Sequence, residues 1–139
     1  MPALQTDPRA SPIQDLSGLC VLVLDDDANM RSLIRGTLAR CGCHNVLQTG
    51  DAREALRLFS TRTIDLVISD WLMEPMSGLE FLQELRRPER RASMPVIMLT
   101  GVSDPKDIVK AQAHRISGWL VKPVAPQQLL DSIGAALSL

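Results

Sequence analysis

Short runs of apolar residues alternate with amphipathic stretches along most of the chain. Five continuous apolar runs occur, at residues 20–24, 46–47, 66–68, 96–99 and 119–121. Such runs are typical of strands buried on both faces, as in a parallel sheet covered by helices. Between them, apolar residues recur at helical spacings of three and four, most thinly at residues 105–114. The pattern predicts an α/β fold, a doubly wound (βα)5 parallel five-stranded sheet with strand order 2-1-3-4-5.

Polar residues and prolines mark where the predicted helices begin. Asp27 follows the first apolar run and is expected to cap the helix after it. Prolines at positions 105 and 126 fit the first turn of the last two helices. Two pairs have capping-box spacing, Asp51 with Glu54 and Ser77 with Glu80.

The first 18 residues lack this periodicity. Pro2, Pro8 and Pro12 lie there among small polar residues, a composition that favours irregular structure. We therefore expect a Pro-rich N-terminal tail at residues 1–18. One domain should follow at residues 19–139, which is within the usual size of a single domain.

Charge and composition narrow the class of protein. The 139 residues include 15 Lys and Arg against 16 Asp and Glu, a net charge of −1. Nucleic-acid binding depends on a positive surface that this balance does not indicate. No apolar run approaches the roughly 18–20 residues of a membrane span, and the start does not resemble a signal peptide. We expect no nucleic-acid partner and no membrane insertion.

The cysteines point to a reducing compartment. The chain has three cysteines, Cys20, Cys41 and Cys43, and Cys20 lies in an apolar run. An odd number of thiols does not suggest a set of disulfides, so a cytoplasmic location is expected. Cys41, Cys43 and His44 are close enough in sequence to suggest a metal site. Three ligands so near one another form a poor tetrahedral site, so buried or half-buried loop thiols are the favoured interpretation.

Polar side chains follow four of the predicted strands at their carboxyl ends. Asp25 and Asp26 follow the first strand, Asp70 ends the third, Thr100 the fourth and Lys122 the fifth. The predicted strand order brings these ends together, so the five side chains are expected to meet in one pocket. A hard cation such as Mg²⁺ or Mn²⁺ relieves the repulsion of clustered carboxylates. A carboxylate beside it can attack a phosphoryl group, while an ammonium and a hydroxyl stabilise the developing charge.

Four segments carry a resemblance to a known family: VLVLDDDANMR, DLVISDWLMEPMSGLEFL, VIMLTG and GWLVKPV. In order and spacing they resemble the response-regulator receiver domain of two-component signalling, of the stand-alone CheY-like type with a flavodoxin-like fold. The resemblance covers residues 19–139. It implies a single-domain response regulator that a sensor histidine kinase or phosphotransfer protein phosphorylates on Asp70, in chemotaxis-like signalling or a phosphorelay. It implies that the protein is not a turnover enzyme, although it catalyses its own phosphorylation and dephosphorylation.

The resemblance also implies a ligand set for the cation. Asp70 and Asp26 would bind Mg²⁺, or Mn²⁺, directly. Asp25 would help mainly through water, and the backbone carbonyl of Leu72 would be the remaining protein ligand.

Other residues would act on the phosphoryl group. Thr100 would bond it, and Lys122 would pair with it, aimed by a cis Lys122–Pro123 bond. Leu72 and Val102 would border the path of the hydrolytic water. Neither side chain can hydrogen-bond a water molecule, so slow self-dephosphorylation is expected.

An output surface is expected on the fourth helix, the fifth strand and the fifth helix, around Val109, Gln112, Trp119 and Gln127. A downstream protein would bind there after phosphorylation. Trp119 stands where the family usually has a switch Tyr or Phe, so its bulkier indole leaves the usual coupling to the hydroxyl open.

Two other functions compete with this interpretation. A haloacid-dehalogenase-like phosphatase would use Asp25 as nucleophile and Asp27 as acid–base residue, but Asn29 departs from that motif and Asp70 would have no role. A flavodoxin-like electron carrier would need small hydroxyl residues after the first strand, and these are absent from the sequence there.

Three features lie outside the motifs. Glu74 occupies a position where the family commonly has proline; a solvated side chain is favoured over added charge near the metal. Trp71 is interpreted as an aromatic that covers the surface. A solvated loop is favoured over a nucleic-acid patch for four arginines, Arg86, Arg87, Arg90 and Arg91.

Overall fold

The computed structural model of the chain describes residues 15–138, so most of the expected tail, residues 1–14, lies outside the described residues. Five parallel strands form one sheet in the order β2-β1-β3-β4-β5. The strands are β1 (Cys20–Leu24), β2 (Asn45–Thr49), β3 (Leu66–Asp70), β4 (Val96–Thr100) and β5 (Gly118–Val121). The predicted fold class and strand order are confirmed.

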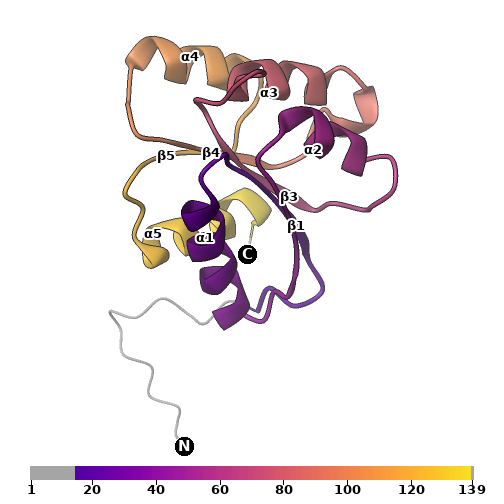
Figure 1. Cartoon of the computed structure of the whole chain (residues 1–139), viewed down its shortest axis with the longest axis vertical. Coiled ribbons are helices and arrows are strands. Elements are labelled where there is room, and N and C mark those ends of the chain that lie inside the picture. Colours follow the sequence, from indigo (N-terminus) through magenta and orange to yellow (C-terminus); the bar gives the residue numbers. More distant parts are fainter. Residues whose placement is uncertain (1–14, 139) are drawn as a thin grey trace, which may run out of the picture.

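Helices cover both faces of the sheet, as Figure 1 shows. They are α1 (Ala28–Arg40), α2 (Ala52–Leu58), α3 (Gly78–Arg86), α4 (Pro105–Ala113) and α5 (Pro126–Leu137), with a short 3-10 helix η1 (Glu89–Arg91) after α3. Apolar side chains of α1 and α5 pack on one face, and those of α2, α3 and α4 pack on the other. No helix within residues 15–138 combines the length and apolar character needed to cross a bilayer.

Burial separates the central strands from the edge strands. Every residue of β1, β3 and β4 is buried, as the continuous apolar runs predict. The edge strands β2 and β5 are mostly half-buried, and each has an exposed residue. The expectation of burial on both faces is therefore wrong for β2 and β5, because each has a neighbouring strand on one side only.

The residues at the helix starts have the predicted capping contacts and prolines, with one exception. Asp27 caps α1 by accepting a hydrogen bond from the Asn29 amide at 2.9 Å, and both bonds of the Ser77 capping box are present. Pro105 and Pro126 are the first residues of α4 and α5. Asp51 also caps its helix, but its own amide donates to the Thr49 hydroxyl at 3.1 Å. The capping box predicted at Asp51 is therefore replaced by a bond to the preceding strand.

Leu16 belongs to the core. Its side chain is 0% exposed and lies in the apolar cluster that contains Ile34 and Leu38. Its amide donates to the Cys41 carbonyl at 2.8 Å, just after α1. At least one residue before position 19 therefore packs against the core. A single leucine among polar residues has no periodicity that could have predicted this.

Arg86 is a buried structural residue, which corrects the interpretation of the arginine run as solvated. Its guanidinium donates to the carbonyls of Arg91, His114 and Arg115 at 2.7, 2.9 and 3.0 Å. Burial and the charge of Arg115 lower the pKa of Arg86 to about 10, so it stays charged at neutral pH. Arg87 and Arg90 are exposed, as predicted. The interpretation failed for Arg86 because two of its three acceptors, the carbonyls of His114 and Arg115, are distant in sequence.

Candidate functional site

Three aspartates gather at the carboxyl edge of the sheet. The parallel pairing of β1 with β3 brings Asp25 and Asp26 next to Asp70, and one carboxylate oxygen from each lies within 4.8 Å of the others. Asp25 and Asp70 are 1% and 6% exposed, whereas Asp26 is open to solvent. Oxygen ligands from carboxylates match the preference of Mg²⁺ and Mn²⁺. The donor set therefore fits a divalent cation, as the sequence predicts.

Lys122 bridges the two buried carboxylates. Its Nζ lies 2.9 Å from Asp25 Oδ2 and 3.4 Å from Asp70 Oδ1. Its amide donates to the Thr100 carbonyl at 2.7 Å, which holds the end of β5 beside the end of β4. The Lys122–Pro123 bond that follows is cis, the isomer that the family resemblance implies. The arrangement puts one cation beside two anions in a shielded site, where electrostatic interactions are strong.

The charges of the site perturb one another. Burial raises the pKa of the Asp70 carboxyl, and Asp25 raises it further, while Lys122 acts in the opposite direction. Burial by itself would lower the pKa of the Lys122 ammonium, but its hydrogen bond to Asp25 and the charges of both aspartates outweigh burial and raise it. The charged form of the Asp70 carboxyl is therefore disfavoured in this site, and a bound cation would stabilise it.

Thr100 is buried at the end of β4, with its hydroxyl turned into its own loop. The hydroxyl donates to the Val102 carbonyl at 2.9 Å and accepts from the Val102 amide at 3.2 Å. A bond from this hydroxyl to a group on Asp70 would require the Thr100–Val102 contact to open. Breaking the Thr100–Val102 bonds in favour of a group on Asp70 would couple Asp70 to the loop at residues 101–104.

Two residues that sequence reasoning missed contact the backbone at the carboxyl ends of β1 and β3. Gly78 donates its amide to the Trp71 carbonyl at 2.8 Å, and a Cβ at Gly78 would lie 2.8 Å from Trp71 Cα. The Arg31 guanidinium donates to the backbone carbonyl of Asp25 at 2.5 Å. Neither contact leaves a periodic signal, although Gly78 begins a helix next to a capping serine.

An open cavity of about 360 Å³ adjoins the aspartates. It is lined by Asp26, Leu72, Met73, Glu74 and Ser77. The Leu72 side chain is 59% exposed, and Val102 is 61% exposed. Glu74 is exposed to solvent, as favoured from the sequence, but it also faces this cavity.

Trp71 and Trp119 form an aromatic pair beneath the site. Their ring centroids are 5.0 Å apart, with an edge-to-face angle of 64°. Trp71 is buried, so its interpretation as a surface-covering residue is wrong. The Trp119 Nε1 atom is also buried, and it has no hydrogen-bond partner in the described part of the chain. The indole at the expected switch position is thus packed against the residue that follows Asp70.

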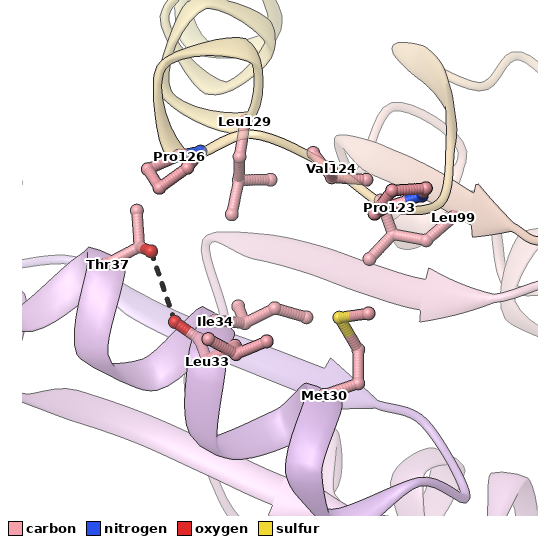
Figure 2. Close-up of a pocket in the computed structure, with 9 residues that line it drawn as sticks. All are labelled: Met30, Leu33, Ile34, Thr37, Leu99, Pro123, Val124, Pro126 and Leu129. Carbon is pink, nitrogen blue, oxygen red and sulfur yellow. Dashed lines mark hydrogen bonds between the residues drawn. The ribbon is translucent and has the colours of Figure 1, made fainter.

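A second, apolar cavity lies among residues of α1, α5 and the loop between β5 and α5 (Figure 2). Its volume is about 110 Å³, and it separates Met30, Leu33 and Ile34 of α1 from the loop that begins at Pro123 and from Leu129 of α5. The Thr37 hydroxyl beside it donates to the Leu33 carbonyl at 3.1 Å. The cavity is therefore lined by apolar side chains, and the Thr37 hydroxyl beside it already donates its hydrogen bond within α1.

The cysteines do not form a second metal site. All three are free thiols, and His44 is exposed. Within residues 15–138, the three aspartates are the only group of three or more His, Cys, Asp or Glu side chains close enough to hold an ion. Burial raises the pKa of the Cys20 and Cys43 thiols, which makes them poor ligands.

Comparison with known proteins agrees with this geometry. A family model described as the response regulator receiver domain matches residues 21–134. The chain is 31% identical to the chemotaxis protein CheY of Pseudomonas aeruginosa over 113 residues, which cover 81% of this chain and 91% of that protein. It is 31% identical to CheY1 of Helicobacter pylori over 118 residues, covering 84% and 95%.

Solved structures show the same relationship. The crystal structure of the chemotaxis protein CheY4 of Vibrio cholerae has a TM-score of 0.80 and 34% identity, and the match covers 86% of this chain and 98% of that one. A receiver domain structure from Clostridium thermocellum has a TM-score of 0.77 and 32% identity, covering 86% and 94%. These matches favour a receiver over a phosphatase. The chain belongs to the response regulator receiver domain family, whose members are signalling proteins and not classical turnover enzymes.

Proposed function

We propose that Asp70 accepts a phosphoryl group from the phosphohistidine of a sensor histidine kinase or phosphotransfer protein, in a reaction that needs Mg²⁺ or Mn²⁺. A carboxylate oxygen of Asp70 forms the new bond to phosphorus while the P–N bond of the donor breaks, and the imidazole leaves with a proton. The observation that supports this proposal is the meeting of Asp25, Asp26, Asp70 and Lys122 at one edge of the sheet.

Each residue of the site has a distinct part in this proposal. Asp26, Asp70 and the Leu72 carbonyl would hold the cation, which supplies charge neutralisation at the phosphoryl oxygens when bound. Asp25 is already paired with Lys122 at 2.9 Å, which supports a role through water and not as a direct ligand. Lys122 and the Thr100 hydroxyl would stabilise the oxygens of the transferred group.

Intact-protein mass spectrometry after incubation with acetyl phosphate tests this chemistry. Wild type should gain one phosphoryl group with Mg²⁺ and none with EDTA, and Asp70→Asn should gain none. Equal incorporation in the two proteins would contradict the assignment. Steady hydrolysis of a generic phosphate ester that is lost in Asp25→Asn would instead favour the phosphatase alternative.

We propose that a downstream protein in the cytoplasm binds the face formed by α4, β5 and α5. This face lies around Val109, Gln112, Trp119 and Gln127. Phosphorylation replaces the single negative charge of the Asp70 carboxylate by a phosphoryl group that carries roughly two. Only Ala111 of α4 is buried, which supports α4 as an element that shifts easily. Amide hydrogen exchange with and without beryllofluoride should change within residues 101–120. Changes confined to the aspartate pocket would contradict this output face.

A further inference from the structure

The cavity beside the aspartates has an acidic wall. Its lining includes the acidic residues Asp26 and Glu74, and among residues 15–138 no Lys, Arg or His lines it. Asp26 also belongs to the group that could hold an ion, so the cavity and the cation site share one residue. A wall with negative but no positive charge suits the hydration shell of a cation better than it suits an anion.

The loop after β3 restrains the backbone of Glu74 beside this wall. Met73 is buried in the core, while Leu72 and Glu74 on either side of it are exposed. The loop ends in the Ser77 capping box, where the serine hydroxyl accepts from the Glu80 amide at 3.1 Å and the Ser77 amide donates to the Glu80 carboxylate at 3.0 Å. Glu74 is thus held between a buried anchor and a capped helix start.

Glu74 lies outside the group of carboxylates close enough for direct coordination, which within residues 15–138 contains Asp25, Asp26 and Asp70. Mg²⁺ prefers octahedral coordination and keeps several waters. The proposed protein ligands, two carboxylates and one backbone carbonyl, leave about three positions for water. A cavity of about 360 Å³ has room for on the order of ten waters at their volume in the liquid.

We infer that Glu74 is an outer-sphere partner of the cation, accepting hydrogen bonds from the water molecules that the cation retains on the cavity side. This inference rests on the proposed function, because it assumes that the aspartates hold Mg²⁺ or Mn²⁺. Removal of the Glu74 charge should weaken divalent-cation binding by about three- to tenfold, the range expected when one unit charge acts on a dication through water.

Isothermal titration of MgCl₂ into the purified, unphosphorylated chain tests this inference without measuring activity. Glu74→Gln removes the charge and keeps the shape of an exposed side chain, so the fold should be retained. Glu89→Gln is the matched control, since Glu89 is exposed in η1, which precedes β4 and so lies at the opposite edge of the sheet. Asp26→Asn removes a direct ligand of the proposed function.

The expected result is weaker binding in Glu74→Gln, unchanged binding in Glu89→Gln and little or no binding in Asp26→Asn. Wild-type affinity in Asp26→Asn would show that the proposed cation site itself is wrong. Loss in Asp26→Asn together with wild-type affinity in Glu74→Gln would overturn the role of Glu74 alone. Equal weakening in Glu74→Gln and Glu89→Gln would also overturn it, because only net charge would then matter.

Discussion

Gly78 lets α3 begin directly against the backbone at the end of β3, where Asp70 lies. Its amide bonds to the Trp71 carbonyl at 2.8 Å, and a Cβ on Gly78 would contact the Asp70 carbonyl oxygen and lie 2.8 Å from Trp71 Cα. These atoms are backbone, so they cannot rotate away as a side chain can. The substitution Gly78→Ala must therefore separate the start of α3 from the end of β3, and Asp70 moves with that strand.

The structure sets the size of this effect through two opposing contributions. Alanine in place of glycine in a helix stabilises by about 0.5–1 kcal/mol. Overpacking against fixed neighbours costs about 1–3 kcal/mol. A net loss of about 1–2 kcal/mol is expected for Gly78→Ala, a large share of a typical stability of about 5–15 kcal/mol. Gly36→Ala on α1 is the matched control, because a Cβ there has no heavy atom within 4 Å, so only the stabilising contribution applies.

Urea denaturation of the two variants and wild type measures the free energies of unfolding, provided that the m-values agree. Phosphate incorporation from acetyl phosphate should fall in Gly78→Ala and stay at the wild-type level in Gly36→Ala, since displacement of a reacting group by about 1 Å can cost a factor of about a hundred in rate. The reasoning is refuted if Gly78→Ala is as stable and as reactive as wild type, or if Gly36→Ala loses as much stability.

The sequence predicts the fold well where local pattern and tertiary environment agree. Every residue of β1, β3 and β4 is buried, and all of them are apolar except Ser69, Asp70 and Thr100 at the carboxyl ends, so the pattern determines these strands. The site follows from the same reasoning, since parallel strands end at one edge and carry their terminal side chains there. Lys122 reaches Asp25 and Asp70 for that reason.

Features that depend on loop conformation or on distant partners were not predictable. The burial of Leu16 depends on its contact with the segment after α1, and that of Arg86 on carbonyls almost thirty residues away. The Thr100 hydroxyl was predicted near the phosphoryl group, but its bonds to Val102 are set by the turn after β4. Trp71 lies in a loop without periodicity, and its burial depends on the core cluster it joins and on its edge-to-face contact with Trp119, which is distant in sequence.

Three further variants test the burial of the Asp70 charge, the packing of Leu16 and the effect of Leu72 and Val102 on the lifetime of the phosphorylated form. Asp70→Asn should raise the free energy of unfolding at neutral pH without metal, because burial raises the pKa of this carboxyl and disfavours its charge in the fold. The gain should fade as pH falls through that raised pKa, or when Mg²⁺ is added, and thermal melts check both. Leu16→Ala should cost about 3 kcal/mol in urea denaturation, whereas Leu33→Ala, at a position 67% exposed, should cost much less. The proposed slow self-dephosphorylation would depend on Leu72 and Val102, which are 59% and 61% exposed and hold no group that can position a water. Replacing Leu72 by Asn and Val102 by Glu should supply such groups, and each 1.4 kcal/mol of added transition-state stabilisation is about a tenfold faster loss of phosphate. Phosphate loss is followed by intact mass after the donor is removed, with Leu33→Asn as the control; an unchanged or longer lifetime in the double variant would show that these apolar side chains do not protect the acyl phosphate from water.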